Sequence, residues 1–146
     1  MTIASNIKPY QYPLLVGAVP STGIVQTVNK SVSVTLPPNS RFVWTHTLNA
    51  TVQLTAGGNS IRLMLFDSIK GPVFNVGTNV TNIAGAIYQV FSAAPRDIRP
   101  FPLPEAYVFE QGAVISATYT VVLTPNGGDP SFSSVGIILC GYRLTI

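Results

Sequence analysis

The longest alternation of apolar and polar residues lies between residues 42 and 54, and it constrains the fold more than any other feature. One parity is apolar except for His46: Phe42, Trp44, His46, Leu48, Ala50, Val52 and Leu54. The other parity is mostly Thr, Asn and Gln, with Val43 as its large apolar exception. Successive side chains of a strand point to opposite faces, so this period of two predicts a strand with one face on a core. Because the run is long for one strand, we expect a bend or tight turn near Asn49.

Further strands are predicted by shorter patterns of the same kind. In residues 113–123 the side chains of Ile115, Tyr119, Val121 and Leu123 share one parity. The segment 32–36 alternates valine or leucine with Ser and Thr, and the final segment 134–146 is predicted to be a strand inside a sheet. The segment 61–66 is apolar on both parities except for Arg62, which predicts a strand covered on both faces.

Seven or eight strands separated by short Pro-, Gly- and Asn-rich turns predict an all-β, single-domain antiparallel β-sandwich with a jelly-roll arrangement. Residues 1–22 are predicted to form an extended N-terminal arm with a short strand at 12–16, and residues 23–146 the sandwich. The region 72–95 is harder to interpret. Within it, residues 84–94 fit a short helix, whereas residues 87–91 fit a strand.

The composition is unusually poor in charge. Hydrophobic residues make up 47% of the chain and charged residues 9%, against about 25% charged residues in an ordinary soluble domain. Two explanations remain open: much of the surface faces a partner, or the surface is rich in Thr and Asn. No apolar run approaches the ~18 residues of a membrane span, so we expect no membrane partner.

The charge pattern and the N-terminus restrict partners and location. The formal net charge is +3, and the cations are scattered, without a basic run. Nucleic-acid-binding arms are usually clusters of Lys and Arg, so we expect no nucleic-acid partner. Residues 1–8 lack a charged start followed by an apolar run, so we expect no secretory signal and synthesis in the cytoplasm.

Groups suited to catalysis are few. The chain has one histidine, His46, which we interpret as structural because it lies on an apolar parity. Its one cysteine, Cys140, lies in an apolar run and is interpreted as a small buried residue. Glu105 and Glu110 are five apart in an extended segment, a spacing that does not indicate a glycosidase pair. We therefore expect no enzyme, no metal and no cofactor.

The segment 96–112 is the strongest candidate for a binding surface. Its prolines, Pro100, Pro102 and Pro104, predict an extended stretch with few ladder hydrogen bonds of its own. Arginine and aromatic residues are enriched at protein interfaces. The interface candidates, including two tyrosines of the N-terminal arm, are Tyr10, Tyr12, Arg96, Arg99, Phe101 and Tyr107. The alternative is that the segment only crosses between sheets while its aromatic side chains fill the end of the core.

Two motifs in about the last 50 residues are similar to those of a known class of proteins. Residues 99–112 read Arg-Pro-Phe-x-x-Pro-Glu-x-Tyr-x-Phe-x-x-Gly and precede a Thr-rich strand, and the closing strand contains Gly-Tyr-Arg at 141–143. The pattern resembles the jelly-roll cement or decoration proteins on the heads of tailed bacteriophages. The resemblance implies a non-enzymatic virion protein, made in the host cytoplasm, that binds the outer surface of the major capsid protein. It also implies a homo-oligomer, either a dimer or a trimer.

Two other functions remain open. One is a carbohydrate- or receptor-binding sandwich of a phage tail or spike, in which Trp44, the six tyrosines and Asn-rich loops would form a sugar platform. The other is a small viral jelly-roll capsid protein, against which the short chain and the lack of a basic arm argue.

Overall fold

The computed structural model describes residues 7–17, 26–55, 58–76, 81–83, 86–88, 100–124 and 131–146. The strands are β1 (Ile7–Val16), β2 (Gln26–Thr35), β3 (Ser40–Asn49), β4 (Val52–Thr55), β5 (Gly58–Asp67), β6 (Gly71–Val76), β7 (Thr81–Ile83), β8 (Ala86–Tyr88), β9 (Phe101–Phe109), β10 (Val114–Thr124) and β11 (Ser131–Thr145). All regular structure in these ranges is strand, which confirms the all-β prediction.

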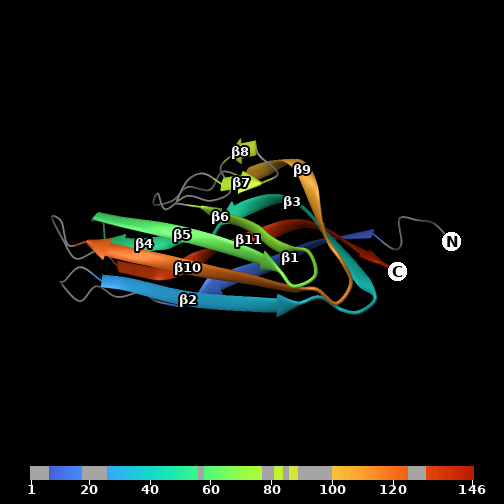
Figure 1. Ribbon diagram of the computed structural model, residues 1–146, viewed down its shortest axis with the longest axis horizontal. Coiled ribbons are helices and arrows are strands. Elements are labelled where there is room, and N and C mark those ends of the chain that lie inside the picture. The colour runs from blue at the N-terminus through green and yellow to red at the C-terminus, as the bar shows by residue number, and fades with distance from the viewer. Residues whose placement is uncertain are drawn as a thin grey trace.

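Two antiparallel sheets face each other to form a sandwich (Figure 1). One, which we call the β1 sheet, has the order β1-β11-β3-β9, with β4 paired to the start of β11. The other, the β2 sheet, has the order β2-β10-β5-β6. Strands β1, β2, β3 and β5 alternate between the sheets, as do β6, β9, β10 and β11. This order is that of a jelly roll, as the sequence predicted.

The small antiparallel pair of β7 and β8 lies in the region that the sequence left open. Residues 86–88 are a strand, so the helix alternative for 84–94 is wrong at these three positions. The rest of that segment lies outside the described residues.

The core between the sheets is aromatic at one end and aliphatic along its length. Its largest fully buried side chains include Phe42, Trp44, Phe109 and Tyr119. The rings of Trp44 and Phe109 are 6.3 Å apart between centroids. In β10 the side chains of Ile115, Ala117, Tyr119 and Val121 are all buried, which confirms the predicted parity of this strand.

The buried hydroxyl of Tyr119 links the two sheets. It donates a hydrogen bond to the carbonyl oxygen of Leu14 (2.7 Å) and accepts one from the backbone N–H of Ile137 (3.2 Å). Burial raises the pKa of this phenol above its ordinary value. The group therefore stays neutral and keeps donating at any physiological pH.

Strand β3 contains a β-bulge that changes its alternation. Along β11, Cys140 pairs with His46 and the next residue, Gly141, pairs with Trp44, so Thr45 has no partner of its own. Beyond the bulge Thr47 is fully buried, while His46 and Leu48 are only partly buried. The prediction that a single parity from residue 42 to 54 faces the core is therefore wrong after Trp44, because one extra residue exchanges the two faces.

The predicted turn near Asn49 is confirmed. Strand β3 ends at this residue, and its side-chain oxygen accepts a hydrogen bond of 3.1 Å from the backbone N–H of Thr51. Strand β4 begins at Val52, so the long alternating run is two strands.

Strand β5 lies inside the β2 sheet, but only one of its faces is covered. Leu63 and Leu65 are fully buried, whereas Met64 is 38% and Phe66 40% exposed. The prediction that both faces of this strand are covered is wrong. A jelly roll has two layers, so one face of each sheet is not part of the core.

Strand β1 pairs with β11 along all ten of its residues, which makes it twice as long as the short strand expected at 12–16. Tyr12, Leu14 and Val16 contribute to the core, so residues 7–16 belong to the sandwich itself. Residue 22, where the arm was predicted to end, lies outside the described ranges, and the division into 1–22 and 23–146 stays a prediction. No helix able to cross a membrane occurs in the described chain.

Candidate interaction surfaces

Strand β9, which holds the prolines of the predicted binding segment, is the outermost strand of the β1 sheet. Its ladder to β3 is interrupted: Tyr107 pairs with Trp44, and the next paired residue along β9 is Pro102, opposite His46. A proline has no N–H to give to a ladder, so prolines are found at sheet edges. The prediction of an extended stretch with few ladder hydrogen bonds is confirmed for β9.

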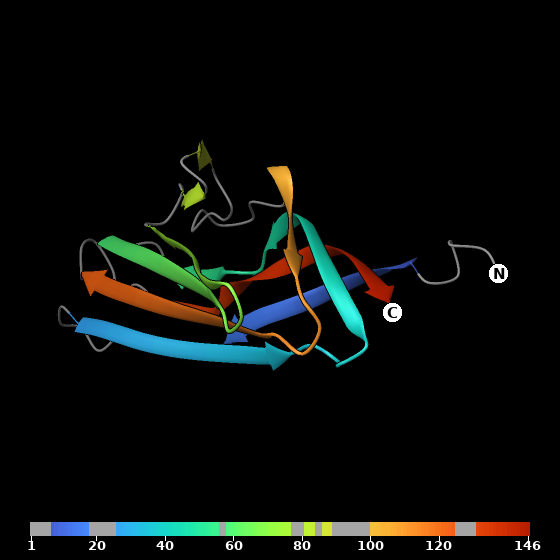
Figure 2. The same ribbon diagram turned by 45° about the vertical axis from the view of Figure 1, so that its right-hand side comes forward.

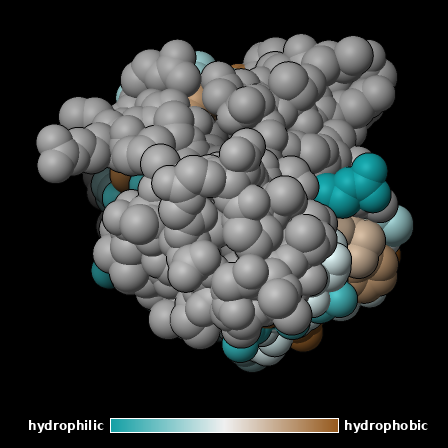
Figure 3. Space-filling view, turned by 90° about the vertical axis from the view of Figure 1, so that its left-hand side faces the viewer, coloured by the Kyte–Doolittle hydropathy of each residue, from teal (hydrophilic) through white to brown (hydrophobic). Residues whose placement is uncertain are grey.

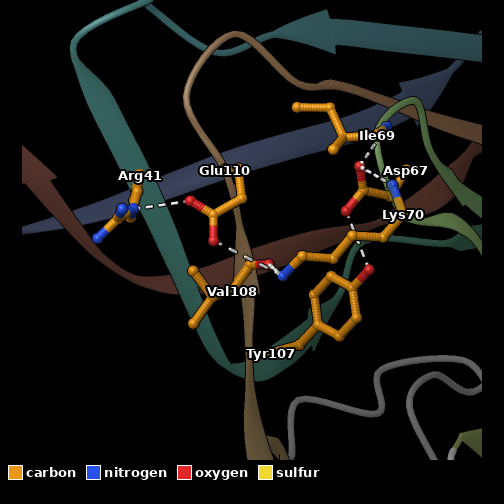
Figure 4. Close-up of polar contacts among 7 residues, drawn as sticks. All are labelled: Arg41, Asp67, Ile69, Lys70, Tyr107, Val108 and Glu110. Atoms are coloured by element: carbon orange, nitrogen blue, oxygen red, sulfur yellow. Dashed lines mark hydrogen bonds and ion pairs between the residues drawn. The ribbon is translucent and has the colours of Figure 1, made fainter.

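A buried carboxylate at the end of β5, that of Asp67, holds β9 in place, in an arrangement that we call the Asp67 clasp (Figure 4). The carboxylate accepts hydrogen bonds from the Tyr107 hydroxyl (2.9 Å) and from the backbone N–H groups of Ile69 (2.9 Å) and Lys70 (3.3 Å). Lys70 donates from Nζ to the carbonyl oxygen of Val108 (2.5 Å) and lies 5.2 Å above the Tyr107 ring centroid. The chain itself thus supplies the side chains that hold the proline segment.

The hydroxyl of Tyr107 stays protonated near neutral pH, because its pKa is raised. Burial, the hydrogen bond to Asp67 and the negative charge of that carboxylate all raise the pKa of this phenol. The hydroxyl therefore remains a donor to Asp67, and the contact persists over the physiological pH range.

Glu110, which directly follows β9, also makes structural contacts. Glu110 forms an ion pair with Arg41 (2.7 Å) and a longer one with Lys70 (3.9 Å). These side chains are 35–45% exposed, so each ion pair contributes only about 0–1 kcal/mol to stability.

The single histidine makes a local contact: Nδ1 of His46 lies 3.0 Å from the hydroxyl of Thr45. Within the described ranges, no three His, Cys, Asp or Glu side chains come together as metal ligands.

Of the six predicted contact residues, the four that the structure describes do not lie together on one exposed surface. Tyr12 is 7% and Phe101 5% exposed, so a partner could touch little of either ring, and replacing them would disturb the core. Tyr107 is partly buried in the Asp67 clasp, whereas Tyr10 is 38% exposed. Arg96 and Arg99 lie outside the described residues. The interface role of these residues stays a prediction, and the structure leaves Tyr10 the most accessible of those it describes.

The clearest exposed cluster lies where the start of β1 and the end of β11 extend past the ends of β2 and β10 (Figures 1 and 2). We call this part the β1–β11 projection. Farther along β1 the even-numbered residues face the core. In the projection the even-numbered residues are Lys8 and Tyr10, and both side chains are exposed. A hollow of about 330 Å³ opens between the two strands, and it is lined by Lys8, Pro9, Tyr10, Arg143 and Thr145.

The hollow is cationic and aromatic. The guanidinium carbon of Arg143 lies 4.6 Å from the centroid of the Tyr10 ring, and its Nη2 donates to the hydroxyl of Ser40 (3.1 Å). Beside it the Tyr12 hydroxyl is buried and has no hydrogen-bond partner in the structure. Burial raises the pKa of Tyr12, against the opposing effect of the Arg143 charge. No Asp or Glu side chain is among the residues that line this hollow.

Exposed apolar side chains also lie on these two strands, although Leu15 is at the other end of β1 and Tyr142, opposite Pro9, is on the other face from Lys8 and Tyr10. The described part of the chain leaves eight large hydrophobic side chains exposed, and five of them belong to β1 or to the end of the chain at β11: Ile7, Tyr10, Leu15, Tyr142 and Ile146. Clustered apolar exposure beside polar groups is typical of interaction surfaces.

Sequence reasoning did not select Lys8 and Arg143. Arg143 is part of the Gly-Tyr-Arg motif, but the motif does not indicate which residues lie next to the arginine in the fold. The two cations are far apart in the chain and come together because β1 pairs antiparallel with β11, with Lys8 opposite Arg143. Such pairing of the two ends of a chain leaves no local signal in the sequence.

A second, shallower hollow lies on the outer face of the β2 sheet. It measures about 190 Å³ and is lined by Arg62, Met64, Thr118 and Thr120. The hydroxyls of Ser31 and Thr118 are 3.1 Å apart across the strands. Figure 3 views this face nearly edge-on, and the described residues seen there include both hydrophilic and hydrophobic ones. It is the less basic and less aromatic of the two hollows.

Cys140 is buried, as predicted, and is 2% exposed. Burial also raises the pKa of its thiol, which lowers the fraction of reactive thiolate. We expect a maleimide to label folded protein on the order of a hundredfold more slowly than protein unfolded in guanidinium. Mass spectrometry over a time course measures the two rates. Equal rates would mean that the β11 region opens freely.

Comparisons with known proteins give only a distant likeness. No protein-family model matches the chain, and a search of curated proteins found no match. Among solved structures, "Structure of infectious bursal disease virus Gx strain" matches with a TM-score of 0.38 and 12% identity, over 95% of this chain and 32% of that one. "Crystal structure of infectious bursal disease virus VP2 subviral particle" matches with a TM-score of 0.38 and 10% identity, over 95% and 33%.

The chain thus spans about a third of the length of the chains it matches. A likeness of this extent assigns neither a family nor a function. The functional argument below is therefore built on the sequence motifs and the exposed surface of this chain.

Proposed function

We propose that this chain is a non-enzymatic structural protein of a virus particle, and that it acts as a cement or decoration protein on the outer surface of a bacteriophage capsid. The observation that carries the proposal is the β1–β11 projection, where apolar, aromatic and cationic side chains are exposed together. The resemblance of segments 99–112 and 141–143 to phage cement proteins supports it. The low content of charged residues, 9%, fits a surface that is partly covered in the working state.

The mechanism is stabilisation by selective binding. A protein that binds only the assembled shell of the major capsid protein stabilises that shell by its binding free energy. Weak contacts repeated over a symmetric lattice, or made by a dimer or trimer of this chain, add through multivalency. The site of action is then the virion, and the partner is the major capsid protein.

The direct test is on purified particles of the phage that encodes the chain. We expect the protein in the particles, with density outside the shell by electron microscopy. Particles that lack it should release DNA at a lower temperature, and should release it on transfer to low salt under conditions that particles with the protein survive. Absence of the protein from purified particles, or equal survival without it, would contradict the proposal.

A surface variant tests which part of the chain binds. Replacing Tyr10 and Tyr142 together by alanine should lower occupancy on the particle, because both rings lie exposed on the projection. The matched control replaces Met64 and Phe66, two exposed apolar side chains on the β2 sheet, by alanine. Quantitative mass spectrometry of particles measures both occupancies. A larger loss in the control would move the binding surface to the β2 sheet.

The carbohydrate-binding alternative loses its main element. Trp44 is fully buried, and its Nε1 donates to the carbonyl oxygen of His46 (3.0 Å), so its ring cannot stack on a sugar. Glycan binding by the isolated protein would revive that alternative. Spontaneous shell formation by the pure protein would favour the capsid alternative.

A further inference from the structure

We propose that the β1–β11 projection binds an extended, acidic segment of another protein, whose carboxylates lie between Lys8 and Arg143. This inference rests on the proposed function, because the acidic segment would then belong to the surface of a capsid subunit. It goes further by naming the chemistry of the partner and the residues of this chain that recognise it.

The first argument is the pairing of two like charges. Lys8 and Arg143 are directly opposite each other in the ladder between β1 and β11. Opposite residues of an antiparallel pair have Cβ atoms about 5 Å apart, where like charges disfavour the sheet. Among the residues that the structure describes, no Asp or Glu side chain lines the hollow beside them. A bound carboxylate would supply the missing negative charge and relieve the repulsion.

The second argument is that Arg143 is already held in a binding geometry. Its guanidinium carbon lies 4.6 Å from the centroid of the Tyr10 ring, and Nη2 donates a hydrogen bond to the Ser40 hydroxyl at 3.1 Å. A guanidinium has five N–H donors in a rigid fork that matches a carboxylate. An arginine fixed in this way loses little side-chain freedom on binding, which favours affinity. The exposed part of Tyr10 adds an apolar floor for the stems of the partner's side chains.

Pairing of the partner as an added strand at the free edge of β1 is disfavoured. No described strand pairs with the other edge of β1. However, the backbone N–H groups of every second residue point to the same edge of a strand. Pro9 and Pro13 are four residues apart, so the two N–H groups that they lack are missing from the same edge. Because β1 keeps its ladder with β11 throughout, that side is the free edge. A partner here would gain few backbone hydrogen bonds, and its recognition depends on side chains.

A second copy of this chain is a poor source of the acid. Its five acidic residues are scattered along the sequence and no two are adjacent: Asp67, Asp97, Glu105, Glu110 and Asp129. Among those in the described ranges, Asp67 is buried and Glu110 already pairs with Arg41, which leaves Glu105. One carboxylate can neutralise only one of the two cations. The chemistry therefore favours a different protein that presents several acids in a row.

The experiment uses fluorescence anisotropy of the full chain with a short, fluorescein-labelled peptide of alternating Glu and Thr. We expect binding that weakens as salt is raised. Lys8→Gln and Arg143→Gln should each weaken it roughly tenfold, the effect of one charge-assisted contact. Arg62→Gln, which removes an exposed cation from the other hollow, is the matched control and should change affinity less than twofold, as expected for a charge outside the site. A peptide with Gln in place of Glu should not bind.

Controls separate binding from folding. Lys8 is exposed, so Lys8→Gln should leave thermal unfolding unchanged. Arg143→Lys keeps the charge but not the fork, and it should retain part of the affinity if recognition is by charge. The inference is overturned if the peptide does not bind, or if Arg62→Gln weakens binding as much as Lys8→Gln. It is also overturned if single-stranded DNA binds more tightly, or if the Lys8 variant loses only self-association in analytical ultracentrifugation.

Particle occupancy distinguishes failure of this inference from failure of the proposed function. If the unmodified protein is on the virion and the Lys8 and Arg143 variants occupy it equally well, the inference is wrong while the proposed function stands. If the unmodified protein is not on the virion, the proposed function is wrong. The peptide result then still decides whether the projection binds acidic segments.

Discussion

Replacement of Gly141 by alanine is expected to destabilise the protein by about 3 kcal/mol or more, at the upper end of the range for overpacked interiors. A Cβ atom at this position would lie 1.8 Å from the carbonyl oxygen of Val43. That oxygen belongs to the backbone of β3, so the clash cannot be relieved by rotating a side chain. The residue also follows the register shift between β11 and β3, which therefore depends on the close approach of the two strands.

Urea unfolding followed by tryptophan fluorescence measures this loss, because the single tryptophan, Trp44, pairs with Gly141 and is fully buried. The matched control is Gly17→Ala, since nothing lies within 4 Å of a Cβ added there. We expect the control to change stability by less than about 1 kcal/mol. A Gly141→Ala variant as stable as the control would show that β3 and β11 can separate at the bulge without cost.

The bulge also explains where sequence reasoning about the fold stopped. Alternation located β2, β3 and β10, because a strand that covers a core repeats every two residues, and continuous apolar runs located β5 and β11. It could not reveal that Thr45 is an extra residue, since the pattern of apolar residues continues past it through His46 and Leu48. The bulge is set by a contact between two strands, at Val43 and Gly141, and a pattern within one strand carries no information about it.

The candidate site was predictable only in part, for a related reason. The sequence showed that aromatic residues gather in 96–112, but an aromatic ring has the same pattern in a core and at an interface. In the fold Phe101 and Phe109 are buried, and Tyr107 makes an internal hydrogen bond. Motif residues that looked like contacts therefore stabilise the sandwich. The exposed cluster arises instead from the pairing of β1 with β11, which joins distant residues.

Replacement of Asp67 by alanine is expected to destabilise the protein by about 2–4 kcal/mol. The carboxylate is fully buried and accepts three hydrogen bonds, from Tyr107 and from the backbone N–H groups of Ile69 and Lys70. Removing it leaves buried donors without partners, and each costs about 1–3 kcal/mol when water cannot replace the contact. Glu110→Ala removes a surface ion pair near the same strand and should cost only about 0–1 kcal/mol.

A double-mutant cycle with Tyr107→Phe isolates the hydrogen bond that holds β9 to the end of β5. We expect Tyr107→Phe alone to cost about 1–2 kcal/mol, and the double variant to cost less than the sum of the two single changes by a similar amount. Urea unfolding at neutral pH measures all four proteins, and both groups keep their roles there because the raised pKa of Tyr107 leaves its hydroxyl protonated. Strictly additive losses would mean that the hydrogen bond contributes nothing, and that β9 is held by its buried phenylalanines alone. A coupling of the expected size would show that the proline-rich strand, with its interrupted ladder, depends on a side chain from the opposite sheet for its position.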